Sequence, residues 1–317
     1  MSNPVRVKVL RYVWDSGWSG AAAAAPWSDR TFAEIFQEHN GWSLRDFWRR
    51  GSLGRLDLRF DIDPWSVLRG AAHEELHADR RKIIAACRAQ AAVDGLLFDD
   101  YDHVIVFVHE PPSDTGTYDG DLVLDQGRTL EYYQYAIGRM LGFRPGYGKG
   151  GRFDDPYCVM GSGLGDHLID PPPLTSIGDQ QWRSGPRVSA AALYRYLHDY
   201  RVTVPLSTLD EEVTLTALPD AVDGSVTLAV CPTFGGGRVA VEYRTAVGDD
   251  QGVTPGVVVH SIGVRPDGED DPEIDPVRFE VAVPAAAGAE VIIVGDLRLK
   301  VLDAPDPSTV TVTFTRV

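Results

Sequence analysis

The sequence predicts an α+β protein in which a mixed α/β region is followed by an all-β region. The chain has 317 residues, of which 44% are hydrophobic, and this is enough to build two domains with substantial cores. The net charge is −4 over residues 1–204 and −12 over residues 205–317. The hydrophobic pattern changes at the same place, from mixed helical and strand spacing to strand spacing alone. We therefore expect one domain at residues 1–204 and a second at residues 205–317.

The first region contains segments of both periodicities. Apolar residues recur at helical spacing in residues 31–37, 68–93, 129–141 and 188–200. Strand-like runs occupy residues 5–13, 56–60 and 103–108. The last run is almost entirely β-branched or aromatic, which is typical of a strand buried on both faces. A binding site at the end of that strand would include His109 and Glu110, but lone histidines are common near strand ends and we favour a histidine that simply caps the strand.

The second region contains eight short runs rich in Val and Thr, separated by turn residues. They span residues 213–218, 225–230, 239–243, 256–260, 278–283, 290–294, 297–302 and 310–314. Eight strands of this kind predict a β-sandwich, with residues 267–275 as a solvated acidic loop.

The composition argues against several classes of partner. A net charge of −16 repels phosphate backbones and anionic membrane surfaces, so we expect neither nucleic acid nor a membrane as partner. The sequence has no run of 18 apolar residues, and the alanine run at residues 21–25 is too short for a signal or a span. The three cysteines are widely spaced, which predicts neither a disulfide framework nor a thiolate zinc site. These features lead us to expect an acidic cytoplasmic protein.

One literal H-E-x-x-H motif is present, formed by His73, Glu74 and His77. Such a motif can bind zinc and activate water when both histidines lie on one helix face. The hydrophobic stripe of the surrounding segment puts the two histidines on its flank, and no Gly or third His follows at the required spacing. We favour a solvated face here and keep a zinc hydrolase built on these residues as the alternative.

A second segment fits the frame of the zincin pattern H-E-x-x-H-x-x-G-x-x-H/D without its ligands. Gly142 occupies the turn position, whereas Tyr135 and Arg139 replace the two histidines and Ala136 replaces the glutamate. Pro145 stands at the third ligand position. Downstream, residues 157–163 resemble the methionine-containing turn of metzincin-like peptidases, with Tyr157 at its start and Met160 as the methionine.

Further stretches are similar, in the same order, to one group of secreted enzymes. They are Ser43-Leu44-Arg45-Asp46-Phe47-Trp48 with Gly51-Ser52-Leu53-Gly54-Arg55-Leu56, Phe98-Asp99-Asp100-Tyr101-Asp102, Val241-Glu242-Tyr243-Arg244, and Gly248-Asp249 followed by Gly256-Val257-Val258-Val259-His260. Together with the two motifs above, they resemble the immune inhibitor A-like metallopeptidases and cover most of the chain. The resemblance implies a zincin-like (metzincin-like) N-terminal domain followed by an all-β sandwich domain.

The altered motif predicts that peptidase activity and zinc are lost. A fixed guanidinium charge at a ligand position repels a metal cation, and without the metal its water activation is lost. We therefore expect a pseudoenzyme without a cofactor that binds a peptide, protein or small-molecule ligand in the former cleft.

Glu131, Tyr135 and Arg139 recur every four residues and so share one stripe of the predicted helix. We interpret Tyr135, Arg139, His109, Tyr157 and Met160 as candidate ligand-binding residues. Arg139 could hold an anionic ligand or could pair internally with Asp154 or Asp155, and we favour the internal pair. A metal-free activity that uses Glu131, Tyr135 and Arg139 is a further alternative.

Overall fold

The computed structural model describes residues 4–15, 25–70, 73–149, 151–161, 183–205, 209–233, 237–263, 277–293 and 297–317. The chain forms two compact units. The first unit contains residues 1–49, 56–143 and 170–184, and the second contains residues 50–55, 144–169 and 185–317. The two units are interleaved along the chain, and the boundary expected at residues 204 and 205 remains a prediction. The acidic stretch 267–275 lies outside the described residues.

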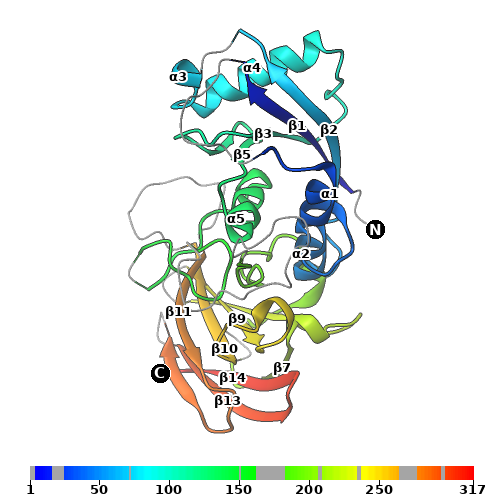
Figure 1. Cartoon of the computed structure of the whole chain (residues 1–317). Helices are drawn as coiled ribbons and strands as arrows, with labels where there is room; N and C mark the ends of the chain where they lie inside the picture. Colours follow the sequence, from blue (N-terminus) through cyan, green and yellow to red (C-terminus); the bar gives the residue numbers. More distant parts are fainter. Residues whose placement is uncertain are drawn as a thin grey trace. The chain divides into compact units, whose positions relative to one another are not determined.

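The first unit contains a five-stranded sheet in the order β2-β1-β3-β5-β4 (Figure 1). The strands are β1 (Val5–Trp14), β2 (Leu58–Leu68), β3 (His103–Val108), β4 (Gly116–Tyr118) and β5 (Asp121–Asp125). All neighbouring pairs are parallel except β4 with β5, so β4 is an antiparallel edge strand. The parallel strands therefore present their carboxyl ends at one edge of the sheet, where His109 follows β3.

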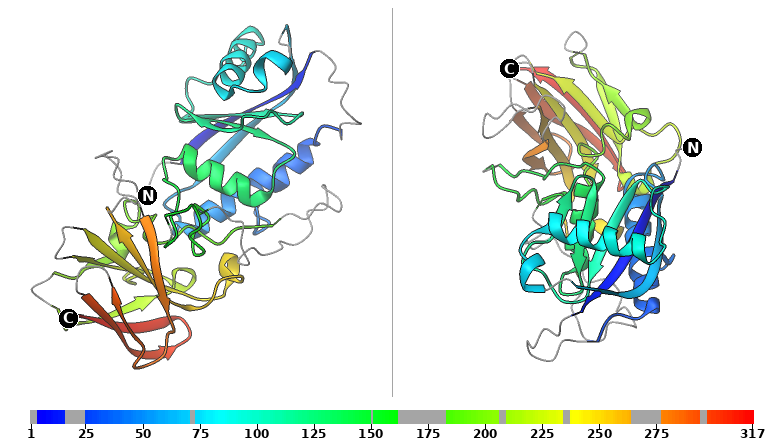
Figure 2. Two further views of the ribbon diagram at one scale, coloured as in Figure 1. Left: turned by 90° about the vertical axis from the view of Figure 1, so that its left-hand side faces the viewer. Right: turned by 90° about the horizontal axis from the view of Figure 1, so that it is seen from above.

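Helices cover both faces of this sheet (Figure 2). The unit contains α1 (Asp29–Phe32), a π-helix (Ala33–Gln37), most of α2 (Leu44–Gly51), α3 (His73–Leu76), α4 (Arg80–Val93) and α5 (Leu130–Met140). On one face, Ile83, Ile84 and Cys87 of α4 pack in a single apolar cluster with alternate residues of β1 and β3. On the other face, Phe107 lies against the rings of Phe32 and Tyr133. The residues of β3 from Val104 to Val108 are at most 1% exposed, so the prediction that this strand is buried on both faces is confirmed.

The helix predicted at residues 68–93 is wrong in its first half. β2 continues to Leu68, the short helix α3 ends at Leu76, and α4 begins at Arg80. The break has a local cause, because the Asp79 side chain accepts a hydrogen bond from the Arg81 backbone N–H (3.0 Å) and caps a new helix. The strand predicted at residues 56–60 begins two residues later, at Leu58, and continues to Leu68, because residues beyond Phe60 also pair with β1.

The second unit contains two sheets around one apolar core. One sheet has the order β11-β10-β9-β8-β6 and the other β12-β13-β14-β7. The strands are β6 (Arg201–Thr203), β7 (Glu212–Thr216), β8 (Leu228–Pro232), β9 (Arg238–Arg244), β10 (Gly256–Ile262), β11 (Val277–Val283), β12 (Glu290–Ile293), β13 (Leu297–Asp306) and β14 (Thr309–Arg316). Buried side chains of both sheets form a single cluster, the arrangement of a β-sandwich. Each of the eight strands expected in this region overlaps an observed strand.

The helix predicted at residues 188–200 is absent from the described residues. They form successive turns and end in a 3₁₀ helix (His198–Tyr200); this unit also has 3₁₀ helices at Leu218–Asp220 and Gly248–Asp250. The backbone N–H of Ser189 donates to Cys158 Sγ (3.4 Å) and that of Ala190 donates to the Glu242 carboxylate (2.9 Å). At the beginning of this segment, backbone N–H groups therefore donate to side chains that are distant in the sequence. The helical spacing of apolar residues does not reveal such contacts. The whole molecule has mixed α and β structure, and no described helix is long and apolar enough to cross a membrane.

Candidate functional site

Helix α5 carries the stripe of candidate residues predicted from the sequence. The Thr129 side chain caps it by accepting from the Tyr132 backbone N–H (3.3 Å). Glu131, Tyr135 and Arg139 are all half-buried, whereas the opposite face of the helix packs into the unit. The three side chains therefore lie along one partly accessible face, as the four-residue spacing predicted.

The C-terminal end of α5 fixes Arg139 close to its own helix. Gly142 has φ 86° and its N–H donates to the Arg139 carbonyl (3.1 Å), while the Phe143 N–H donates to the Gly138 carbonyl (2.9 Å). These two bonds form a Schellman motif, which requires the left-handed backbone that glycine adopts readily. Arg139 Nη1 donates to the Phe143 carbonyl (2.8 Å), so the guanidinium lies at the negative end of the helix dipole.

The Asp155 carboxylate, one of the two expected partners of Arg139, is engaged by other groups. Its Oδ1 accepts from the Tyr157 backbone N–H (2.9 Å), and its Oδ2 lies 3.1 Å from His260 Nε2. These contacts engage both oxygens of Asp155, and the internal pair of Arg139 with Asp154 or Asp155 stays a prediction.

Glu131, at the other end of the stripe, has a perturbed carboxyl group. Burial raises the pKa of the Glu131 carboxyl, and the nearby charge of Arg183 only partly opposes that rise. The stripe thus combines a carboxyl that resists ionisation with a permanent cation at Arg139.

His109 lies where the sequence placed it, directly after β3 at the carboxyl edge of the parallel strands. Its side chain is buried, and its ring is edge-on to Trp65 at 6.2 Å between centroids. Within the described residues, Nδ1 of His109 and Oε2 of Glu110 have no hydrogen-bond partner. Unsatisfied buried polar atoms are uncommon in folded proteins, and the ligand-binding role of His109 stays a prediction.

The H-E-x-x-H motif does not lie on one continuous helix. α3 ends at Leu76, and His77 belongs to the turn that precedes the cap of α4. The shared helix face that zinc ligation by this motif requires is therefore interrupted between its two histidines. Among the described residues, no group of three or more His, Cys, Asp or Glu side chains is placed to hold a metal ion.

Tyr157 and Met160 belong to the second unit and are buried there. Met160 is 0% and Tyr157 5% exposed, and the Tyr157 ring packs 5.3 Å from that of Phe279. In this conformation neither side chain presents much surface to a ligand.

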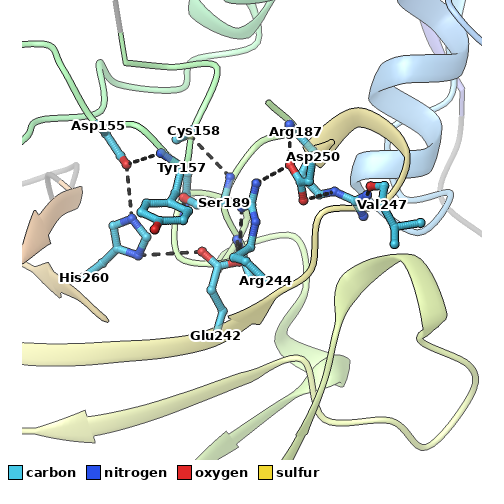
Figure 3. A network of polar contacts seen from close by, with 12 residues as sticks. Asp155, Tyr157, Cys158, Arg187, Ser189, Glu242, Arg244, Val247, Asp250 and His260 are labelled. Carbon is cyan, nitrogen blue, oxygen red and sulfur yellow. Dashed lines mark hydrogen bonds and ion pairs between the residues drawn. The ribbon is translucent and has the colours of Figure 1, made fainter. Parts of the chain in front are cut away.

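The second unit contains a group of charged side chains that the sequence analysis did not recognise as a site (Figure 3). This buried network consists of Asp155, Arg187, Glu242, Arg244, Asp250 and His260, each at most 4% exposed. Glu242 and Arg244 come from β9, and His260 comes from the neighbouring strand β10. Asp250 ends the 3₁₀ helix that follows β9, and Asp155 and Arg187 come from loop segments earlier in the chain.

His260 lies between two carboxylates. Its Nε2 is 3.1 Å from Asp155 Oδ2, and its Nδ1 is 3.7 Å from Glu242 Oε1, which is longer than a hydrogen bond. Burial opposes the charged imidazolium, but Asp155 and Glu242 outweigh it and raise the pKa of His260 above its usual value. The two acids therefore favour the protonated form of His260 over a wider pH range than an exposed histidine would keep it.

The arginines complete the charge balance of the buried network. Arg244 Nη2 lies 2.5 Å from Asp250 Oδ1 and its Nη1 lies 3.5 Å from Glu242 Oε2, while Arg187 Nε lies 2.6 Å from Asp250 Oδ2. Burial lowers the pKa of Arg244, but the attached carboxylates outweigh it and raise that pKa above its usual value. When His260 is protonated and all three acids are ionised, three positive groups face three carboxylates. Burial raises the pKa of the Glu242 carboxyl, and the charges of Arg244 and His260 oppose that rise. Buried ion pairs of this kind hold separate segments of the chain together.

The sequence contained a signal for part of this network. Glu242, Arg244 and His260 stand in the stretches that carried the resemblance in the second region, but nothing in their spacing indicated that they meet Asp155 or Arg187. Comparison with protein-family models gave no match for the chain, and a search of curated proteins gave no significant one.

Proposed function

We propose that this chain is a catalytically degenerate metallopeptidase-like protein with a zincin-like first domain, and that it binds an anionic group of a peptide, protein or small molecule without zinc. The proposal rests on the sequence resemblance and on α5, the helix to which that resemblance assigns the zinc motif. Arg139 stands on this helix at the second ligand position and is half-buried. A permanent cation there opposes a metal and favours a carboxylate or phosphate, which a guanidinium can bind through two hydrogen bonds.

The position of the guanidinium supports this interpretation. Its Nη1 donates to the Phe143 carbonyl, which fixes the side chain in one orientation. A cation fixed in this way loses less conformational entropy when an anion binds than a mobile side chain does. Tyr135, one turn earlier on the same face, can add a phenol hydroxyl to the same ligand.

The first test is the metal content of protein purified without chelator, measured by mass spectrometry. We expect far less than one zinc per chain. Stoichiometric zinc that disappears in His73→Ala would instead establish the hydrolase built on His73, Glu74 and His77, and would refute the proposal.

The second test measures ligand binding with defined probes. Citrate and acetyl-triglycine carry carboxylates, and acetyl-triglycine amide is the neutral control for the peptide. A bound probe at a hundredfold excess over its Kd should stabilise the protein by about 2.7 kcal/mol. Arg139→Ala should abolish this stabilisation, whereas Arg81→Ala should not, because Arg81 is 67% exposed on α4. Equal stabilisation of both variants would contradict the assignment to Arg139.

A further inference from the structure

The first unit contains a cavity on a different part of its surface from the α5 stripe. Its lining residues come from β1, the edge strand β2, α1 and the π-helix that follows α1. Figure 1 shows α1 beside these two strands. Its volume is about 420 Å³, within the range of small-molecule sites. The polar residues that line it are Arg11, Asp29, Gln37 and Asp61, with Ala33 and Pro64 among the others.

The hydrogen-bond donors of these lining side chains are already engaged or enclosed. Arg11 Nε donates to the Asp63 carbonyl, and its Nη2 pairs with Asp29 Oδ1 at 2.7 Å. Gln37 Nε2 donates to the Phe60 carbonyl. The remaining nitrogen, Arg11 Nη1, is buried and has no hydrogen-bond partner among the described residues.

Aromatic rings explain why the Arg11 guanidinium can remain buried. Its Cζ lies 4.6 Å from the Phe32 ring centroid and 5.5 Å from that of Trp65. Cation–π contact stabilises the charge in this place. Arg11 therefore lines the cavity in a fixed position, and its N–H groups are not accessible to a ligand.

The hydrogen-bond acceptors, in contrast, are only partly used. Asp29 pairs with Arg11 through Oδ1 alone, and Asp61 receives both Lys8 Nζ (3.2 Å) and the Tyr101 hydroxyl at Oδ2. Asp29 Oδ2, Asp61 Oδ1 and Gln37 Oε1 thus make no hydrogen bond within the described residues. The side chains around the cavity offer three acceptor oxygens, two of them carboxylate oxygens, and almost no donor.

We propose that this cavity binds a cationic hydrogen-bond donor, the guanidinium or ammonium of an arginine or lysine side chain on a partner peptide. A group of this kind has several N–H bonds and no acceptor, which complements the set of free oxygens. Asp29 and Asp61 already pair with Arg11 and Lys8, and a cationic ligand would add a second partner at the oxygen that each carboxylate leaves free. An anionic ligand would find no accessible donor there. The carboxylates of Asp29 and Asp61 are 86% and 54% exposed, so the site is open to solvent and each ion pair contributes modestly.

The test compares cationic probes with a neutral isostere by calorimetry on the full chain. The probes are the methylamides of Nα-acetyl-arginine, Nα-acetyl-lysine and Nα-acetyl-citrulline. We expect both cationic probes to bind and citrulline to bind about tenfold more weakly or not at all, because its urea group lacks the charge. The ratio of the arginine to the lysine affinity distinguishes a guanidinium site from an ammonium site. Equal affinity for citrulline, or no binding of either cation, would overturn the proposal.

Substitutions locate the binding to this cavity. Asp29→Asn and Asp61→Asn should each weaken binding about fivefold, the effect expected for one exposed ion pair. Asp99→Asn is the matched control, because Asp99 is exposed in the same unit and does not line the cavity. Ala33→Phe should block the site without changing its charge, and a circular dichroism spectrum like that of the wild type confirms that each variant folds. Retained affinity in both Asp29→Asn and Ala33→Phe would refute the assignment.

This site is independent of the proposed anion site on α5. Arg139→Ala should leave the binding of the arginine probe unchanged, and Asp29→Asn should leave the binding of citrate unchanged. The failure of one proposal can therefore be distinguished from the failure of the other.

Discussion

Arg244 provides a direct test of the buried network, because it is the cation that bridges two of its carboxylates. The side chain is 1% exposed and contacts Asp250 at 2.5 Å and Glu242 at 3.5 Å. Arg244→Met removes the charge but keeps most of the volume. Arg187 and His260 are then left to balance three buried carboxylates.

The expected loss of stability follows from this imbalance. Removing one partner of a buried ion pair costs about 3–5 kcal/mol, because the other charge remains in a medium that solvates it poorly. Arg244 faces two carboxylates, so we expect a loss near the upper end of that range. This is a third or more of the total stability of a typical protein, about 5–15 kcal/mol.

The measurement is urea unfolding followed by circular dichroism, with two further variants for comparison. Lys300→Met removes an exposed positive charge from the same unit and should change the unfolding free energy by less than about 0.5 kcal/mol. The double variant Glu242→Gln/Arg244→Met should recover part of the loss, because one carboxylate is removed with the cation. A loss below about 1 kcal/mol for Arg244→Met, or no recovery in the double variant, would refute the charge balance described above.

Two further predictions concern the same unit. Because the pKa of His260 is raised on folding, its contribution to stability is complete below its unfolded pKa of about 6.5 and is lost as the pH rises through the higher folded value. The unfolding free energy of the wild type, measured from pH 6 to pH 9, should therefore fall relative to that of His260→Gln, and parallel curves would contradict the prediction. Gly256→Ala should destabilise the protein by about 1–3 kcal/mol, because a Cβ there would lie 2.7 Å from the Val283 carbonyl oxygen in the paired strand. Gly51→Ala in α2 is its control and should be neutral or stabilising in the same unfolding assay, since the nearest atom would lie 4.0 Å away.

The elements that the sequence predicted well are those whose signals are local. The eight strands of the second region have regular alternation and turn residues, and each has an observed counterpart. Helix α5 has a capping threonine at Thr129 and a terminating glycine at Gly142, and it begins and ends within one residue of the prediction. Local capping and periodicity determine such elements because the interactions lie within a few residues.

The sequence analysis was wrong where contacts with distant segments determine the secondary structure. Residues 188–200 have helical spacing but form successive turns, and side chains of the distant residues Cys158 and Glu242 accept hydrogen bonds from the N–H groups of Ser189 and Ala190. The short strands β4 and β5 lacked a distinct pattern and are held by pairing with each other and with β3. Information of this kind lies in contacts between segments and not in the segments themselves.

The candidate sites divide in the same way. The amino-acid sequence by itself shows that Tyr135 and Arg139 stand where the zincin pattern has its two histidines, and it predicts that Glu131, Tyr135 and Arg139 share one helix face. Both follow from spacing along a single segment. Only the tertiary structure decided that Asp155 binds His260, that the network excludes solvent, and that free acceptor oxygens line a cavity beside β2. These depend on the burial and the distances of side chains that lie up to about a hundred residues apart, and the strength of each charge depends on that burial.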